Sequence, residues 1–116
     1  RNQKVNMKEY LFVYGLFRDS ARNLLGEFIK CGKAFISGDL YKVSEFYPGY
    51  KKGNGQVWGD VYLIDPSILD ELDEFEGDEY IRTKVRTSTD VYCWVYEYKN
   101  DTSNFEIIEG GDWLLR

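Results

Sequence analysis

Residues 69–77, with the sequence Leu-Asp-Glu-Leu-Asp-Glu-Phe-Glu-Gly, form the most informative stretch of the chain. Asp65 and Pro66 stand just before this stretch and suit the cap and the first position of a helix. Gly77 supplies the left-handed residue that ends many helices. Apolar residues recur at helical spacing: Ile68, Leu69, Leu72 and Phe75. The stretch therefore predicts one helix that packs its apolar side on a core.

The charge of this helix is unusual, because carboxylates crowd its C-terminal half, where the helix dipole disfavours anions. Glu76 lies four residues after Leu72 and seven after Leu69, which places it on the inward side. A carboxylate that faces a core loses hydration, and this raises its pKa toward the range of a working base. Glu76 is therefore a candidate general base. Two alternatives are a frayed last turn that returns it to water, and a buried pair with Arg82.

Length and composition favour a single strand-rich domain. The chain has 116 residues, 17% of them aromatic, and a net charge of −5, which argues against nucleic acid and anionic membranes as partners. No apolar run approaches the roughly 20 residues that span a bilayer, and no signal-peptide pattern is present, so we expect a cytoplasmic protein. The polar residues 1–8 are predicted to form a disordered N-terminal segment, and residues 9–116 a single domain.

The residues that the chain lacks narrow its chemistry. There is no His, which removes Ser-His-Asp and Cys-His catalysis and His metal ligands. Cys31 and Cys93 are far apart and lack the spacing of a metal or redox motif, and Cys93 fits a small buried hydrophobe. We expect no metal site and no cofactor. Proton chemistry in this chain would rest on carboxylates, supported by tyrosines, lysines and backbone amides.

The first strand and the turn after it form a second candidate site. Residues 9–14 predict a buried strand that stops at Gly15, and a short helix is predicted from Ser20 or Asn23 to about Lys30. A strand that runs through a glycine turn into a helix can offer free N–H groups to an anionic ligand. The pattern is weak by itself, because most such turns only redirect the chain.

The remaining elements are mostly strands. Alternation and turn residues predict one bent strand or two short ones over 32–43, a loop over 44–55, a strand over 57–64, a hairpin of 80–87 and 91–98, and a further strand near 105–109. Two helices accompany them. The predicted fold class is α+β, a small mixed β-barrel with two short flanking helices.

Several blocks resemble the γ-glutamylcyclotransferase-like family, which includes AIG2-like proteins and γ-glutamylamine cyclotransferases. Tyr14-Gly15-Leu16-Phe17-Arg18 is similar to the family signature Tyr-Gly-Thr-Leu-Arg. Further blocks follow in the family's order: Gly38-Asp39-Leu40-Tyr41, Tyr47-Pro48-Gly49, Val57-Trp58-Gly59-Asp60-Val61-Tyr62, Leu72-Asp73-Glu74-Phe75-Glu76-Gly77 with Tyr80 and Arg82, and Gly111-Asp112-Trp113. The resemblance runs from about Tyr10 to Trp113, nearly the whole chain. No single block is specific, but the ordered set is.

The resemblance implies an intramolecular reaction on a small γ-glutamyl substrate. The free α-amine of a γ-glutamyl group attacks its own γ-carbonyl, which forms 5-oxoproline and expels an amine. It also implies that Glu76 is the general base and that the turn of Tyr14, Gly15, Leu16 and Phe17 holds the substrate, largely through backbone amides. No cofactor is implied.

The chain departs from the family pattern at Leu16 and Phe17, where the signature has Thr and Leu. If the Thr hydroxyl contacts substrate, binding weakens; if main-chain N–H groups make the contacts, little changes. Tyr80 and Arg82 share a strand face and are candidates to orient Glu76 or to bind a substrate carboxylate. For Arg82 the alternative is a structural ion pair with a helix carboxylate. Arg18 stands next to the turn and is a candidate to attract an anionic substrate, but the favoured prediction is a lone surface arginine.

These observations lead to one hypothesis and two alternatives. The hypothesis is a cytoplasmic cyclotransferase that acts on a γ-glutamyl amine or amide. The first alternative is a non-catalytic protein that uses the same pocket to bind a small ligand or a partner. The second is a different reaction that depends on a carboxylate, such as amide hydrolysis. The sequence leaves open whether the chain is a monomer or a homodimer.

Overall fold

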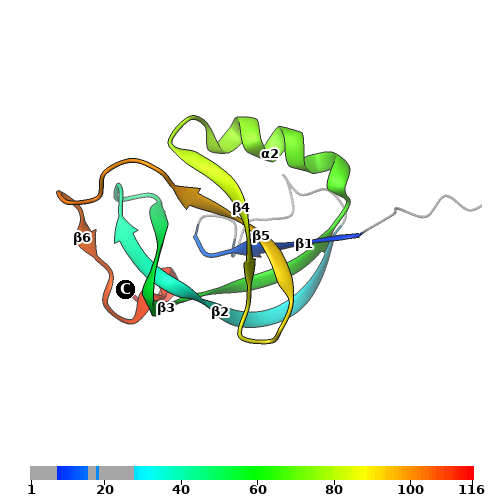
Figure 1. Ribbon diagram of the computed structural model, residues 1–116, viewed down its shortest axis with the longest axis horizontal. Helices are drawn as coiled ribbons and strands as arrows, with labels where there is room; N and C mark the ends of the chain where they lie inside the picture. Colours follow the sequence, from blue (N-terminus) through cyan, green and yellow to red (C-terminus); the bar gives the residue numbers. More distant parts are fainter. Residues whose placement is uncertain (1–7, 16–17, 19–27) are drawn as a thin grey trace, which may run out of the picture.

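The computed structural model describes residues 8–15, 18 and 28–116 (Figure 1). Within these residues the chain forms six strands, one α-helix and three short 3-10 turns. The elements are β1 (Glu9–Val13), β2 (Phe28–Lys42), β3 (Pro48–Ile64), η2 (Pro66–Ile68), α2 (Leu69–Glu76), β4 (Tyr80–Arg86), β5 (Tyr92–Tyr98), β6 (Glu106–Ile107), η3 (Glu109–Gly111) and η4 (Trp113–Leu115). No helix in this part of the chain is long and apolar enough to cross a membrane.

The strands form one sheet in the order β4-β5-β1-β3-β2-β6, and β3 also pairs with β5. This extra pairing means that the sheet curls back on itself into a half-barrel, with α2 lying along one side of it (Figure 1). In the sheet, β1 is central: it is antiparallel to β3, with Phe12 opposite Val61, and parallel to β5, with Leu11 opposite Trp94. The site described below is built around the end of β1.

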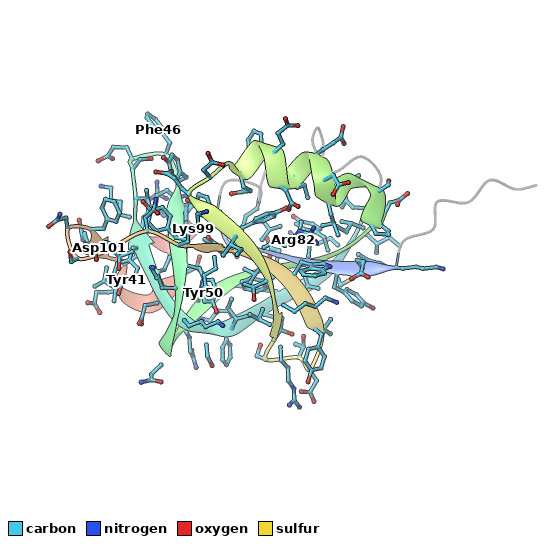
Figure 2. The ribbon with its side chains drawn as sticks, turned by 45° about the horizontal axis from the view of Figure 1, so that its top comes forward. Tyr41, Phe46, Tyr50, Arg82, Lys99 and Asp101 are labelled. Atoms are coloured by element: carbon cyan, nitrogen blue, oxygen red, sulfur yellow. The ribbon has the colours of Figure 1, made fainter. Side chains whose placement is uncertain are left out.

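The curl originates in the long β2–β3 ribbon. The two strands pair antiparallel, but between Ser37 and Asp39 the register shifts, so that Gly38 alone faces residues 52–55 of β3. Such a bulge bends a ribbon. A Cβ at Gly38 would overlap the Tyr50 ring, so glycine allows the two strands to approach closely here. The bend brings Tyr50, labelled in Figure 2, into register with Glu97 of β5, and this pairing closes the curl.

Two hydrophobic clusters share β1. Alternate residues of a strand point to opposite faces, so Phe12 packs inside the curl while Leu11 and Val13 pack under α2. The inner cluster includes Ile36, Val57, Val61, Val95 and Trp113; the helix-side cluster includes Ile64, Leu69, Leu72 and Tyr96. The inward face of α2 is thereby fixed against β1.

Most of the predicted architecture is confirmed. The fold class is α+β with a curled, barrel-like sheet, and residues 80–86 and 92–98 form the expected hairpin. The Asp65 carboxylate caps η2 by accepting from the Ser67 N–H at 2.9 Å. Gly77 ends α2 with a φ of 79°. Cys93 is fully buried, as its alternation predicted.

The loop predicted over 44–55 is wrong for most of its length. Only residues 43–47 separate β2 from β3, and Pro48 begins a continuous strand. The glycines and polar residues of this stretch are typical of turns, but here they bulge against β2 and stay in the sheet. Ladder hydrogen bonds to a long neighbour outweigh local propensity.

The helix predicted to end near Lys30 is wrong at its C-terminal end. Phe28, Ile29 and Lys30 belong to β2 and pair with residues 62–64 of β3. The expected helix residues before Phe28 lie outside the described residues, as does the predicted disordered segment except for the exposed Lys8. That segment and the domain bounds stay predictions.

Adjacent glycines near the C-terminus provide a matched test of how that segment docks on β3. Gly110 and Gly111 both have positive φ, 81° and 66°, but a Cβ at Gly110 meets open space whereas one at Gly111 would overlap the Gln56 carbonyl oxygen. Gly111→Ala should therefore lower the free energy of unfolding by about 2 kcal/mol more than Gly110→Ala, measured by urea denaturation. Equal losses in the two variants would contradict the docking of this segment.

Candidate active site

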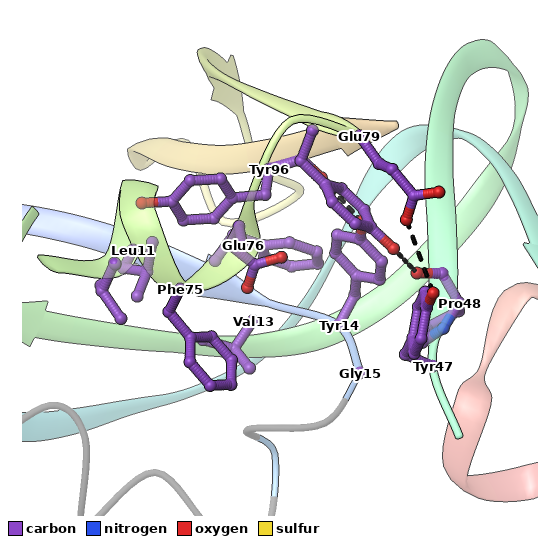
Figure 3. A pocket seen from close by; sticks show the side chains of 13 residues that line it. Leu11, Val13, Tyr14, Gly15, Tyr47, Pro48, Phe75, Glu76, Glu79 and Tyr96 are labelled. Carbon is purple, nitrogen blue, oxygen red and sulfur yellow. Dashed lines mark hydrogen bonds between the residues drawn. The ribbon is translucent and has the colours of Figure 1, made fainter. Parts of the chain in front are cut away.

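A cavity of about 300 Å³ opens where the end of β1 meets the C-terminal end of α2 (Figure 3). The 43–47 loop and the start of β4 complete its wall. Its lining residues come mainly from these four segments: Leu11, Phe12, Val13, Tyr14, Gly15, Tyr47, Pro48, Leu72, Phe75, Glu76, Glu79, Tyr80 and Tyr96. The lining is mostly apolar and aromatic, with a few polar groups, which is the usual character of a small-molecule site.

Glu76 is the last residue of α2, and its carboxylate points into this cavity (Figure 3). The side chain is partly buried, and burial raises its pKa from the ordinary 4.5 to about 7. Among the residues that the structure describes, none forms a hydrogen bond or an ion pair with this carboxylate. Glu76 is thus an unpaired carboxylate poised to exchange a proton near neutral pH.

Three nearby tyrosine hydroxyls could lower the pKa of Glu76 by donating hydrogen bonds to its carboxylate, but they donate to other groups. Tyr14 donates to the Tyr96 carbonyl oxygen, Tyr80 to the Pro48 carbonyl oxygen, and Tyr96 to Asp73 Oδ1, each at 2.7 Å. Burial is the main cause that raises the pKa of all three tyrosines, and the charge of Glu76 adds to it. Because these hydroxyl hydrogens are committed elsewhere, the Glu76 carboxylate receives none of them.

Tyr14 and Gly15 hold the end of β1 beside the cavity. The Tyr14 hydroxyl accepts from the Tyr50 N–H at 3.1 Å while it donates to Tyr96, so it ties β1 to both β3 and β5. A Cβ at Gly15 would lie 2.8 Å from Pro48 Cδ, so glycine allows this close approach. Both residues line the cavity. Their predicted role in binding substrate stays a prediction. The predicted contacts from Leu16 and Phe17 lie outside the described residues.

Arg18 is buried, which corrects its prediction as a surface residue. Only 5% of it is exposed; its Nε lies 3.2 Å from Asp60 Oδ2 and its Nη1 lies 2.7 Å from Asp112 Oδ1. Burial would raise the pKa of Asp112, but the hydrogen bond and charge of Arg18 outweigh it and lower that pKa. The Arg18 N–H also donates to the Gly15 carbonyl oxygen at 3.1 Å. Arg18 therefore joins the turn after β1 to β3 and to the C-terminal segment.

Tyr80 and Arg82 separate in the structure. Tyr80 lines the cavity, but Arg82 does not. The Arg82 Nε and Nη2 donate to the two Asp73 carboxylate oxygens, at 2.7 and 3.0 Å, and the guanidinium lies over the Trp94 ring. The hydrogen bond from Arg82 is the main cause that lowers the pKa of Asp73. For Arg82 the geometry matches the alternative interpretation, a structural ion pair with a helix carboxylate.

Sequence reasoning missed Glu79, an exposed residue at the cavity rim. Its Oε1 accepts a long hydrogen bond from the Tyr47 hydroxyl, at 3.5 Å (Figure 3). The only available signal was its position three residues after Glu76, beyond the glycine that ends α2.

The fold and cavity define a curled-sheet protein that presents one desolvated carboxylate to the end of its first strand. Residues 11–115 match the family described as "Gamma-glutamyl cyclotransferase, AIG2-like", and the chain belongs to this family, as its sequence blocks predicted. It is 37% identical to the γ-glutamylcyclotransferase family protein YtfP of Escherichia coli, with 91% of this chain and 96% of that protein covered. A putative γ-glutamylcyclotransferase of Vibrio cholerae is 32% identical, with 95% and 99% covered.

Solved structures agree on the fold. The solution NMR structure of E. coli ytfP matches with a TM-score of 0.73 at 35% identity, and covers 90% of this chain and 96% of that one. The crystal structure of a mouse AIG2-like protein matches with a TM-score of 0.76 at 23% identity, over 90% and 87% of the two chains. At that identity the second likeness concerns the fold alone.

Because burial raises the pKa of Glu76, we expect the free energy of unfolding to depend on pH. The folded state binds the Glu76 proton more tightly than the unfolded state does. The protonated carboxyl therefore contributes most to the free energy of unfolding below pH 4.5, and this contribution is lost as pH rises through about 7. Glu76→Gln removes the buried charge. The difference in unfolding free energy between the variant and the wild type should shift in favour of the variant by up to about 3 kcal/mol between pH 4 and pH 8, measured by urea denaturation.

Glu74→Gln is the control for this measurement, because it removes an exposed carboxylate from the same helix. The same dependence on pH in the two variants, or no gain of Glu76→Gln over the wild type between pH 4 and pH 8, would contradict the desolvation of the Glu76 charge.

Because Arg18 is buried between two carboxylates, we expect its removal to destabilise the folded protein. Arg18→Met leaves the Asp60 and Asp112 carboxylates buried, with only Lys30 and Lys33 still within ion-pair distance among the described residues. The expected loss is about 3 kcal/mol of unfolding free energy, because removing one partner of a buried pair strands the other charge.

Arg86→Met is the matched control, because it removes the arginine of an exposed ion pair with Asp90. Thermal and urea unfolding should show little change in this variant. A loss in Arg18→Met no larger than in Arg86→Met would contradict the anchoring role of Arg18.

Proposed function

We propose that this protein is a γ-glutamylcyclotransferase that converts a γ-glutamyl amine or amide into 5-oxoproline and a free amine, with Glu76 as the general base. The observation that carries the proposal is the Glu76 carboxylate in the cavity, which has no partner among the described residues and whose pKa burial raises to about 7. Family membership supports the same class of reaction. A base with this pKa is half ionised at neutral pH, where a substrate ammonium must lose its proton.

The reaction balances with the groups that the substrate and Glu76 provide. The Glu76 carboxylate takes a proton from the substrate α-ammonium, and the free amine attacks the γ-carbonyl carbon. The new C–N bond closes a five-membered ring and moves an electron pair onto the carbonyl oxygen. The attacking nitrogen then carries two hydrogens and a positive charge. The leaving nitrogen takes the first proton from Glu76, the freed Glu76 carboxylate takes the second proton from the ring nitrogen, and the bond to the leaving nitrogen breaks as the electron pair returns from the oxygen. Glu76 passes this second proton to the released amine, which departs as an ammonium ion. No water is consumed, and nothing is oxidised or reduced.

The cavity would contribute by orientation. Holding the α-amine against its own γ-carbonyl selects the reactive conformation from the many that a free γ-glutamyl chain adopts. The apolar floor of Leu11, Val13 and Leu72 strengthens electrostatic interactions inside the cavity. Main-chain N–H groups in the turn that begins at Gly15 are the proposed donors to the oxyanion and the substrate carboxylate. Contacts from Leu16 and Phe17 belong to this proposal.

The proposal also includes the remaining expectations from the sequence. The substrate is a small molecule, and the chemistry as written needs no cofactor. A cytoplasmic location, the absence of nucleic acid as a partner, and the choice between monomer and homodimer stay predictions.

The test is product formation from a panel of γ-glutamyl amines and γ-glutamyl dipeptides, followed by chromatographic detection of 5-oxoproline. Glu76→Gln keeps the shape of the side chain but cannot accept the proton, and should lower kcat/KM by a factor of about 10² to 10⁴. In the wild type, kcat/KM should fall as the pH drops below about 7, because Glu76 becomes protonated. Glu74→Gln, which alters an exposed carboxylate outside the cavity, should retain full activity.

Other results would select the alternatives. A binding protein would release no product, and its ligand affinity would be similar in wild type and Glu76→Gln. Free glutamate in place of 5-oxoproline would identify a hydrolase. Ring product that persists in a folded Glu76→Gln variant would overturn the role of Glu76.

A further inference from the structure

The rim of the cavity carries a second carboxylate in a defined position. Glu79 follows the glycine that ends α2, and its carbonyl oxygen accepts from the Lys99 N–H at 2.9 Å, which fixes its main chain. Its side chain is held toward Tyr47 by the hydrogen bond across the rim (Figure 3). Glu79 is exposed whereas Glu76 is partly buried. The two carboxylates therefore stand at different depths of one cavity.

The wall between the two carboxylates is suited to positive charge. Tyr80 lines the same cavity as both of them, and the charges of Glu76 and Glu79 add to burial in raising its pKa. The Tyr80 hydroxyl donates its hydrogen to the Pro48 carbonyl and the Tyr47 hydroxyl donates to Glu79, so both hydroxyl oxygens are left with acceptor capacity only. Aromatic ring faces, which also attract cations, make up much of the remaining wall. Among the described lining residues there is no Lys or Arg.

We propose that Glu79, positioned by Tyr47, selects substrates whose leaving amine carries a second positive charge, such as a mono-γ-glutamyl diamine. The inference rests on the proposed function, in which the substrate α-ammonium meets Glu76 in the deeper part of the cavity. The leaving chain then extends along Tyr80 toward the rim, and its distal ammonium pairs with Glu79. A neutral chain of equal length gains no such pair, and an anionic chain is repelled.

The expected selectivity is modest, because an exposed ion pair is weak and is screened by salt. At low ionic strength, kcat/KM for the cationic substrate should exceed that for the neutral one by about threefold to fivefold. The ratio should fall toward one as salt is added.

The experiment compares three γ-glutamyl compounds of matched length, made from 1,5-diaminopentane, n-hexylamine and 5-aminopentanoic acid. The kcat/KM values are measured for wild type, Glu79→Gln and Tyr47→Phe. Asp78→Asn is the matched control, because it neutralises the adjacent exposed carboxylate, which does not line the cavity. Dissociation constants of the three compounds are also measured on a Glu76→Gln background with and without Glu79→Gln, so that binding selectivity is read without turnover.

Support requires a cationic preference that Glu79→Gln abolishes, that Tyr47→Phe reduces and that Asp78→Asn preserves. A preference absent from wild type, or unchanged in Glu79→Gln, would overturn the inference even if every compound yields 5-oxoproline. If no compound yields 5-oxoproline, the proposed function fails, and the dissociation constants alone decide the role of Glu79. Equal affinity for all three compounds, or no binding of any, then overturns that role as well.

Discussion

The chemistry available to this protein depends on one carboxylate that is taken partly out of water without receiving a partner from any residue that the structure describes. Desolvation raises the pKa of Glu76 to about 7, and its tyrosine neighbours give their hydroxyl hydrogens to Tyr96, Pro48 and Asp73. A single hydrogen bond or cation directed at Glu76 would lower that pKa and weaken the base. The hydrogen bonds that hold the strands together are thus the same ones that leave the carboxylate unpaired.

The scaffold is built so that this arrangement holds. The Tyr14 hydroxyl ties β1 to β3 and β5 at the point where the sheet curls, and the bulge at Gly38 makes that curl possible. Arg18 links the turn after β1 to Asp60 and Asp112, which come from distant parts of the chain. A buried cation with two carboxylates is stable only as a complete set, because the loss of one member leaves the remaining charges buried without compensation.

Much of the fold was predictable because local patterns and long-range packing agree. The caps at Asp65 and Gly77 and the apolar stripe of α2 define the helix, and alternation defines the β4–β5 hairpin. Where they disagree, pairing decides: residues 48–56 have turn composition, yet they pair with β2 and stay in the strand. The same holds for Phe28 to Lys30, because local propensity carries no information about their strand partners in β3.

Sequence spacing by itself determined that Glu76 faces inward, because helical periodicity depends only on the residues of one helix. It also placed Tyr14 and Gly15 at the end of a buried strand. Only the tertiary structure decided what surrounds them. The burial of Arg18 and the position of Glu79 at the rim depend on residues far apart in the chain, and no local pattern encodes which distant charges meet. Arg82 lies only nine residues after Asp73, but the sequence left two roles open for it and the tertiary structure pairs it with that carboxylate.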